Sequence, residues 1–260
     1  MTPYALFTWN LLAPEWTSPH PGDDRDFYRH ARPYEAWRHR RPLLLDALRT
    51  VDAELICLQE VSAPFYRRFL GPLLRGRGFE PVFRARRTGA GDIGVLVAHD
   101  TRRFIDLGAV DFSDPELAGR MAGTHLRPVE GGPTLTVATA HLPWSPEESV
   151  RRERLDRALA TLDLRTSDGA QILAGDVNFD PHAHPAWSHW AAAGWATSHP
   201  QPDMPTWAAD GRTERLDAIL ARGAASGLEG DPVPALSPIP GLPSAAFPSD
   251  HVSLRARFRL

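Results

Sequence analysis

The segment QILAGDVN, residues 171–178, joins an apolar run to a polar turn. Its first half is apolar at nearly every position, which is typical of a strand covered on both faces. Asp176 and Asn178 follow where this strand ends. Polar residues also interrupt the ends of other predicted strands, in Trp9-Asn10, Gln59-Glu60, His141-Leu142, Arg215-Leu216-Asp217 and Ser249-Asp250-His251. Strand ends on one edge of a layered α/β fold meet in a crevice, so these side chains are predicted to form one site.

The rest of the chain alternates strands with helices. Short segments rich in β-branched or aromatic residues predict strands over residues 4–9, 54–59, 79–84, 93–98, 134–140, 171–175, 215–221 and 252–258. Apolar residues at helical spacing predict helices over residues 34–51, 63–74 and 147–164, with Pro42 as a kink or break in the first. Long loops are predicted over residues 13–33, 112–129 and 223–248. This order predicts an α/β layered fold, in one domain over residues 1–260.

Composition excludes several classes of protein. The chain has 260 residues, 42% of them apolar, and a formal net charge of −3, so it is no polycation that binds nucleic acid by bulk charge. Cys57 is the only cysteine, which excludes an intramolecular disulfide and a cysteine-rich metal site. The N-terminal residues lack the pattern of a signal peptide, and no apolar run reaches the length of a membrane span. We therefore predict a cytoplasmic monomer with no membrane contact and no obligate protein partner.

The polar residues at the strand ends indicate a metal site. Carboxylates and carboxamides with two histidines form a hard-oxygen site that suits Mg²⁺ or Mn²⁺, whereas zinc favours more histidine or cysteine. Each motif alone has a structural explanation, since Gly-Asp-x-Asn is a common turn and a Glu after a strand is often a solvated strand end. The complete ordered set is what favours a catalytic site.

The ordered set closely resembles the endonuclease/exonuclease/phosphatase superfamily, the deoxyribonuclease-I-like phosphoesterases. The resemblance spans residues 8–258 and implies a four-layered α/β sandwich, with two central mixed β-sheets flanked by helices. Two segments are similar to the branch that contains the deadenylases, nocturnin, the 2′-phosphodiesterases and the Angel proteins. These are His141-Leu142-Pro143-Trp144-Ser145-Pro146 and Phe247-Pro248-Ser249-Asp250-His251.

The resemblance also implies a role for each carboxylate and amide. Glu60 is the expected metal ligand, and Asn10 and Asp250 are expected to complete the metal environment directly or through water. Asp176 is expected to orient and deprotonate the attacking water. Asn178 is expected to hold that water or a phosphoryl oxygen.

The two histidines are expected to meet the phosphoryl group. His251 would lie against the phosphorus centre, held in orientation by Asp217. His141 would donate a hydrogen bond to a non-bridging oxygen as charge grows in the transition state. Some members carry a further carboxylate where this chain has Leu12, so one metal ion and two both stay open.

The substrate side has fewer signals. Trp144 could stack on a base or could pack beneath the loops. Arg84 belongs to an arginine-rich segment that could contact phosphate or could be a solvated face. The resemblance implies an RNA or nucleotide phosphoester substrate, with a 3′ exonuclease or deadenylase, a 2′,5′-phosphodiesterase and a 2′,3′-cyclic phosphatase as competing activities. Lipid or inositol phosphates, DNA repair and an inactive binding module are the alternatives.

Overall fold

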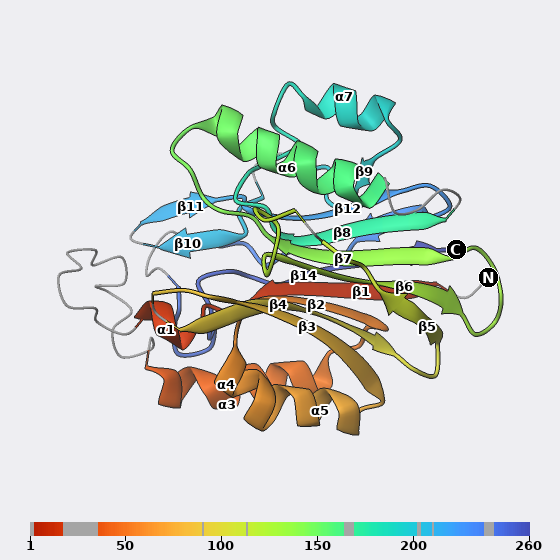
Figure 1. Ribbon diagram of the computed structural model, residues 1–260. Helices are drawn as coiled ribbons and strands as arrows, with labels where there is room; N and C mark the ends of the chain where they lie inside the picture. Colours follow the sequence, from red (N-terminus) through yellow and green to blue (C-terminus); the bar gives the residue numbers. More distant parts are fainter. Residues whose placement is uncertain are drawn as a thin grey trace.

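Two six-stranded mixed β-sheets lie face to face at the centre of the computed structural model (Figure 1). The structure describes residues 3–17, 36–89, 91–112, 114–163, 169–201, 204–209, 211–236 and 242–260. The first sheet has the order β13-β14-β1-β2-β4-β3, and the second has the order β5-β6-β7-β8-β12-β9. Each sheet contains one parallel pair, β1 with β2 and β7 with β8.

The strands of the first sheet are β1 (Tyr4–Asn10), β2 (Leu55–Ser62), β3 (Phe79–Arg87), β4 (Asp92–Asp100), β13 (Ser226–Gly230) and β14 (Leu254–Arg259). Those of the second are β5 (Phe104–Ala109), β6 (Met121–Pro128), β7 (Leu135–His141), β8 (Ala170–Asp176), β9 (Ala196–Thr197) and β12 (Asp217–Arg222). A separate hairpin consists of β10 (Trp207–Ala209) and β11 (Arg212–Glu214). The helices are α1 (Pro14–Thr17), α3 (Trp37–Thr50), α4 (Ala63–Phe65), the π-helix η1 (Tyr66–Leu70), α5 (Gly71–Gly76), α6 (Glu148–Asp163) and α7 (Trp187–Ala192).

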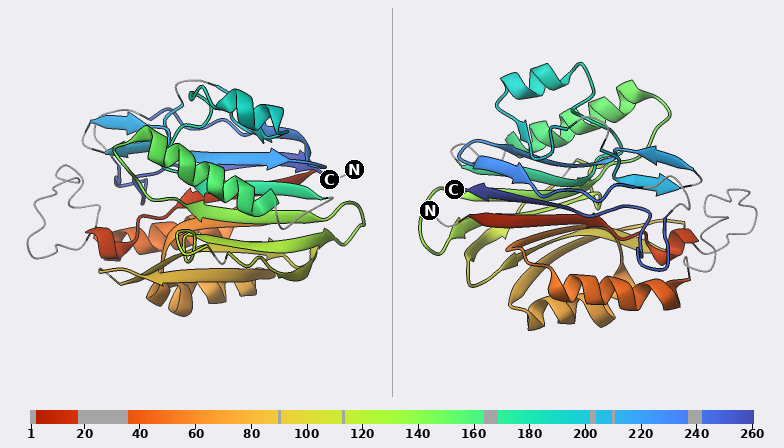
Figure 2. Two further views of the ribbon diagram at one scale, coloured as in Figure 1. Left: turned by 45° about the horizontal axis from the view of Figure 1, so that its top comes forward. Right: turned by 180° about the vertical axis from the view of Figure 1, so that it is seen from behind.

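Three apolar clusters separate four layers. Helices α3 to α5 cover one sheet, and α6 and α7 cover the other (Figure 2). Leu6 of β1 and Ile172 of β8 both belong to the cluster between the sheets, whereas Phe7 faces α3 and Leu173 faces α6. This alternation follows from the two-residue period of a strand. The predicted four-layered α/β sandwich is therefore confirmed.

The eight predicted strands all form, but each of the three predicted loops contains a helix or a strand. Residues 112–129 contain β6, which pairs with β5 on one side and β7 on the other. Gly123, His125 and Arg127 weaken its strand pattern, so pairing on both sides stabilises a segment whose own propensity is low. The predicted loop over residues 223–248 likewise contains β13, and α1 lies in the predicted loop over residues 13–33, of which 18–33 lie outside the described residues.

The three predicted helical segments are helical, with shifted ends. The first begins at Trp37 and runs through Pro42 without a break; residues 34 and 35 of the prediction lie outside the described residues. The second divides into α4, η1 and α5. No helix in the described part of the chain is both long enough and apolar enough to cross a bilayer. The cytoplasmic location and the monomeric state stay predictions.

Candidate active site

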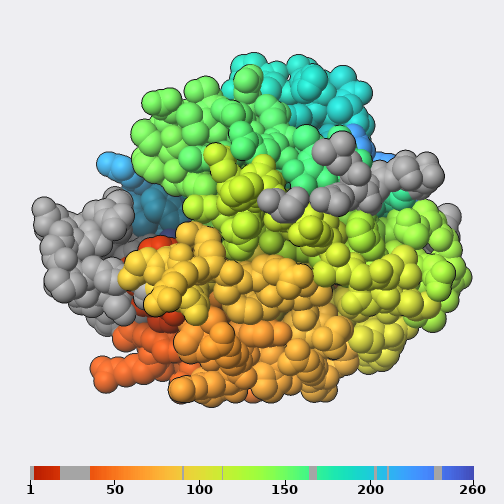
Figure 3. Space-filling view, in the orientation of Figure 1, coloured from red at the N-terminus to blue at the C-terminus, as the bar shows by residue number. Residues whose placement is uncertain are grey.

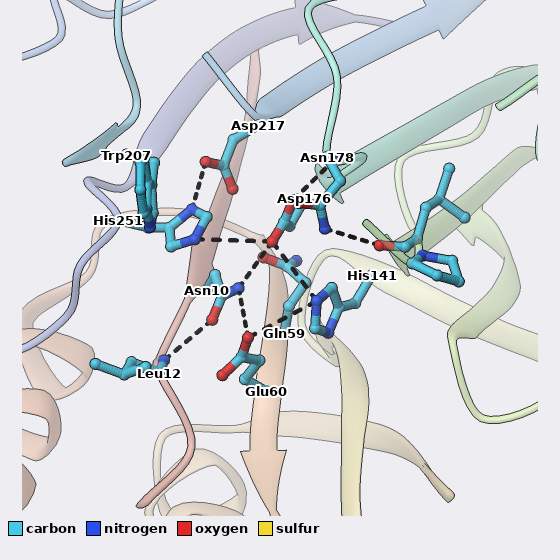
Figure 4. A network of polar contacts seen from close by, with 12 residues as sticks. Asn10, Leu12, Gln59, Glu60, His141, Asp176, Asn178, Trp207, Asp217 and His251 are labelled. Atoms are coloured by element: carbon cyan, nitrogen blue, oxygen red, sulfur yellow. Dashed lines mark hydrogen bonds and ion pairs between the residues drawn. The ribbon is translucent and has the colours of Figure 1, made fainter. Parts of the chain in front are cut away.

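The strand ends meet at one edge of the sandwich, where the apolar cluster between the sheets gives way to polar side chains (Figure 4). On β1 and β2 the register pairs Asn10 with Gln59. On the other sheet Asp176 pairs with both His141 and Asp217. In each of these strands, the residues an even number of positions away from the polar residue face the same way as it does. Where they are apolar, as Leu6 and Ile172 are, they belong to the cluster between the sheets. The site is therefore the polar end of the inter-sheet core.

Glu60 reaches this site through a β-bulge. By alternation Glu60 would face the helices with Ile56 and Leu58, which belong to the outer cluster. The pairing of β2 with β4 shifts by one residue between Leu58 and Val61, and Glu60 has φ 52°. A bulge with a left-handed residue redirects a side chain. The Glu60 carboxylate is then fixed at Oε2 by the backbone N–H of Ala13, at 2.9 Å.

Asn10 joins the carboxylates of the two sheets. Its Nδ2 donates to Glu60 Oε1 at 3.2 Å and to Asp176 Oδ2 at 2.9 Å. Its Oδ1 accepts from the backbone N–H of Leu12 at 3.0 Å, and the side chain is fully buried. The orientation of this amide is therefore fixed by three hydrogen bonds.

The end of β8 and the turn that follows it are closely packed and strained. Gly175 has φ 143°, and a Cβ there would lie 2.2 Å from Ala140 O and 2.9 Å from Gln59 Nε2, so a larger residue does not fit. Asn178 has φ 54°; its backbone N–H donates to Asp176 Oδ1 at 2.9 Å and its Nδ2 to Leu142 O at 2.8 Å. These contacts hold Asp176 and Asn178 in place.

His251 and Asp217 form a buried pair beside Asp176. His251 Nδ1 lies 2.8 Å from Asp217 Oδ2, and its Nε2 lies 3.7 Å from Asp176 Oδ2. Burial lowers the pKa of His251, but the carboxylates of Asp217 and Asp250 outweigh that effect and hold it well above its usual value. The neighbouring carboxylates therefore favour the charged form of His251.

Three contacts fasten the segment that carries His251. Ser249 Oγ donates to Asn10 O at 2.6 Å, and Trp9 Nε1 donates to His251 O at 2.9 Å. Arg40, which is fully buried in α3, donates from Nη1 to Leu11 O at 3.1 Å and to Pro248 O at 3.0 Å. The segment is therefore joined to β1 and α3 across more than two hundred residues of sequence.

His141 completes the ring of side chains. Its Nε2 lies 3.7 Å from Glu60 Oε1 and 3.7 Å from Asp176 Oδ2. Burial, with smaller contributions from Arg86, His251 and Arg120, lowers the pKa of His141 to about 3. His141 is thus neutral at physiological pH, in contrast to His251.

The pKa values of two buried carboxyl groups, those of Glu60 and Asp176, are raised into the neutral range. Burial, reinforced by the charge of Asp250, raises the pKa of Glu60 to about 7. Burial, with the charges of Asp217 and Glu60, raises the pKa of Asp176 to about 8, against the opposing effects of His251 and of the hydrogen bond from Asn10. Burying carboxylates this close together has a cost that a bound cation would remove.

Residues 7–251 match the sequence profile of the Endonuclease/Exonuclease/phosphatase family, which spans all six polar motifs from β1 to His251. The chain belongs to this family. The family predicted from the sequence is therefore confirmed.

Among the relatives of this family member are the Angel proteins. Protein angel homolog 1 of Homo sapiens is 29% identical over 221 residues, which are 71% of this chain and 32% of that protein. Protein angel homolog 2 of Homo sapiens is 25% identical over 195 residues, which are 68% of this chain and 35% of that protein. The chain thus matches about a third of the length of these curated relatives.

Solved structures of the family share the fold. The structure of ANGEL2, described as a 2′,3′-cyclic phosphatase, has a TM-score of 0.80 at 21% identity, covering 98% of this chain and 95% of that chain. The human nocturnin catalytic domain has a TM-score of 0.74 at 21% identity, covering 99% of this chain and 94% of that chain. These two structures show the shared fold, and the predicted deadenylase and Angel branch is supported by the Angel relatives in sequence.

The carboxylate and amide oxygens at the strand ends suit a small divalent cation. Within the described residues, no three His, Cys, Asp or Glu side chains are grouped closely enough to enclose a metal ion by themselves. Mg²⁺ does not need such a cage, because it binds through one or two carboxylates and keeps several waters. The raised pKa values of Glu60 and Asp176, with the amide of Asn10 between them, fit a cation at this point.

The two predicted substrate residues lie on the surface. Trp144 is 60% exposed, so the interpretation that it packs beneath the loops is wrong. Arg84 is exposed on the edge strand β3. Arg86, two residues further along β3, is the arginine whose charge acts on Glu60 and on His141.

Sequence reasoning missed two further residues that contact the site, Gln59 and Trp207. Gln59 Nε2 donates to Thr8 Oγ1 at 3.0 Å and to Thr139 Oγ1 at 2.7 Å, which links the two sheets beneath the site. Trp207 of β10 donates from Nε1 to Asp250 Oδ2 at 2.8 Å. Two-residue alternation from the apolar positions would have assigned Gln59 to the inner face. Nothing in the sequence indicates the contact of Trp207.

Proposed function

We propose that the protein is a divalent-metal-dependent phosphoesterase that hydrolyses phosphoester bonds at RNA or nucleotide 3′ ends, with a terminal 2′,3′-cyclic phosphate as its substrate. The observation that carries this proposal is the meeting of Glu60 and Asn10 from one sheet with Asp176 from the other, against the Asp217–His251 pair. The substrate class is supported by ANGEL2, described as a 2′,3′-cyclic phosphatase and solved with adenosine-2′,3′-vanadate.

Glu60 would hold the metal ion, with Asn10 and Asp250 completing its environment directly or through water. Bound there, Mg²⁺ or Mn²⁺ would neutralise charge on the phosphoryl group and stabilise the leaving oxygen. The raised pKa of Glu60 supports this assignment, because a cation favours the ionised carboxylate that burial disfavours.

Asp176 accepts the proton of the attacking water. Its Oδ1 is occupied by the backbone N–H of Asn178, and its Oδ2 lies between Asn10, His141 and His251. A carboxylate with a pKa raised toward 8 is a stronger base than an exposed one. Asn178 donates from Nδ2 to Leu142 O, which leaves its Oδ1 to accept a hydrogen bond from the same water.

The two histidines act in different protonation states. His251, charged and oriented by Asp217, donates to a phosphoryl oxygen from Nε2. Neutral His141 donates to a second non-bridging oxygen. Water attacks phosphorus, one phosphorus–oxygen ester bond breaks, and the departing ribose oxygen takes up a proton. Exposed Trp144 can then stack on the base, which contributes about 1–3 kcal/mol for each stacked base.

A panel of substrates tests the proposal. RNA oligomers ending in a 2′,3′-cyclic phosphate, a 3′-hydroxyl or a 2′,5′ linkage are incubated with Mg²⁺, with Mn²⁺ and with chelator, beside a DNA duplex with an abasic site and an inositol phosphate. Metal-dependent opening of the cyclic phosphate is expected. Turnover of the inositol phosphate or the DNA alone would assign the site to another substrate, and chelator-insensitive binding without turnover would indicate an inactive binding module. His251→Ala, which removes the phosphoryl donor, serves as the inactive control.

A further inference from the structure

A second group of charges lies beside His141. Arg120 comes from the turn before β6, Arg86 from β3 and Arg154 from α6. The backbone N–H of His141 donates to Arg120 O at 2.8 Å, so this turn is attached directly to the end of β7. Figure 3 shows the yellow-green atoms of the turn next to the green atoms of α6 and the yellow atoms at the end of β3.

A glycine brings two of these arginines together. Gly119 has φ 68°, and a Cβ on it would lie 2.7 Å from Arg86 Cβ and 3.0 Å from Arg86 N. Only glycine allows both this backbone conformation and this approach. The turn therefore lies against β3, and the next residue, Arg120, lies beside Arg86.

Arg154 faces the same place from α6. Its Nη1 donates to Pro143 O at 3.0 Å and to Trp144 O at 3.3 Å, which ties it to the segment after His141. Arg120, Arg154 and Arg157 line a cavity of about 260 Å³, whose other walls are Pro115, Glu116, Leu117 and Pro143. One wall of the cavity is Pro143, which lies between His141 and Trp144 in the sequence, and three of its lining residues are arginines.

The charges at this cavity are not balanced. Arg157 pairs with Glu116 at 3.3 Å and with Asp114 at 3.7 Å. Among the residues that the structure describes, neither Arg86, Arg120 nor Arg154 forms an ion pair with a carboxylate. Burial, together with the charges of Arg86 and Arg154, lowers the pKa of Arg120 to about 10, although the charge of Glu116 acts in the opposite direction. Like charges that are partly buried together are stabilised by an anion.

We propose that Arg86, Arg120 and Arg154 bind a second phosphate of the substrate, the internucleotide phosphodiester next to the group that is hydrolysed. This inference rests on the proposed function and narrows its substrate to an oligonucleotide rather than a mononucleotide. Guanidinium groups suit this ligand because they bind phosphate oxygens through paired hydrogen bonds. The adjoining base then lies toward Trp144, whose carbonyl Arg154 contacts.

Two RNA dinucleotides ending in a 2′,3′-cyclic phosphate test the proposal, one with a phosphodiester and one with an uncharged methylphosphonate at the internal linkage. Dissociation constants are measured by fluorescence anisotropy in an Asp176→Ala background, and initial rates with the otherwise unchanged protein and Mg²⁺. Arg120→Gln is expected to weaken binding of the phosphodiester about 10-fold, the loss of one charge-assisted hydrogen bond, and to leave the methylphosphonate unchanged. Arg120→Lys, which keeps the charge, is expected to retain part of the preference.

Arg152→Gln is the matched control. Arg152 lies on α6, as Arg154 does, but it forms an ion pair with Asp156 at 3.8 Å. It is expected to keep the full preference for the phosphodiester. Equal affinities for the two dinucleotides before mutation, or an equal loss on both in Arg120→Gln, would overturn the proposal. Unequal affinities without any turnover would instead retain the phosphate site and reject the proposed function.

Discussion

Asn in place of Asp217 probes the histidine–carboxylate pair at the centre of the site. Asp217 Oδ2 lies 2.8 Å from His251 Nδ1, and the two side chains are only 1% and 5% exposed. Loss of a buried charged hydrogen-bond partner costs about 2–3 kcal/mol. Since each 1.4 kcal/mol is a factor of ten, kcat of the Asp217→Asn variant is expected to fall about 30- to 150-fold.

The pH profile of this variant has a definite sign. Burial favours neutral His251, but Asp217 and Asp250 outweigh it and hold the pKa well above its usual value of about 6.5. A reaction that needs charged His251 therefore continues past neutral pH and is lost only as the pH rises through this raised pKa. Without the charge of Asp217 the pKa of His251 falls, so the Asp217→Asn variant is expected to lose activity at a lower pH.

Initial rates on an RNA ending in a 2′,3′-cyclic phosphate, taken across the neutral and alkaline range, measure both effects. Asp231→Asn is the control, because Asp231 pairs with Arg255 at 2.6 Å and with Arg257 at 2.7 Å outside the site. It is expected to keep the original profile. A folded Asp217→Asn protein with an unchanged alkaline limb and nearly full kcat would refute the role assigned to the pair.

Three further changes test the metal site, the turn and a buried base. Glu60→Gln is expected to reduce the proton release that accompanies Mg²⁺ binding near pH 7, because burial and Asp250 raise the pKa of Glu60 to about 7, and to leave the part that Asp176 contributes. Calorimetry in two buffers of different ionisation enthalpy measures the release, and equal release from both proteins would contradict this expectation. Gly175→Ala is expected to lower the free energy of unfolding by about 2–3 kcal/mol, because the added Cβ would lie 2.2 Å from Ala140 O. Urea unfolding measures this change, and an unchanged midpoint would show that the backbone relaxes around the new side chain. Burial lowers the pKa of His99 in the folded protein, so the fold favours the neutral imidazole. The stability that this neutral form contributes is present above pH 6.5, which is about the pKa of histidine in the unfolded chain, and it is lost as the pH falls below that value. His99→Gln is expected to reduce that acid sensitivity in urea titrations at neutral and mildly acidic pH, and an identical pH slope would exclude His99 as its source.

Much of this site could be predicted because strand alternation continues into it. Leu6 and Thr8 are followed at the same parity by Asn10, and Ile172 and Ala174 by Asp176, so inner-face positions change from apolar to polar as each strand ends. The register of the paired strands then places these ends side by side. The polar edge of the sandwich follows from this pattern together with the order of the motifs.

Other features depend on contacts that no local pattern encodes. The bulge at Glu60 reverses the side on which alternation would place it, and only the pairing of β2 with β4 reveals the shift. The strand β6 forms because two neighbours supply its hydrogen bonds. Arg86 and Arg120 are joined through Gly119, whose tight approach to β3 is a tertiary event. Arginine composition alone could not distinguish Arg86 from Arg84.

Asn10 and Glu60 arrive on one sheet, and His141, Asp176 and Asp217 arrive on the other, with Gln59 joining the two beneath them. Neither sheet alone holds a working set of groups, so turnover reports whether the sandwich has closed. A partly folded form with both sheets intact but undocked would keep its circular dichroism and lose its chemistry. In a denaturant titration, activity is therefore expected to disappear before the secondary structure melts.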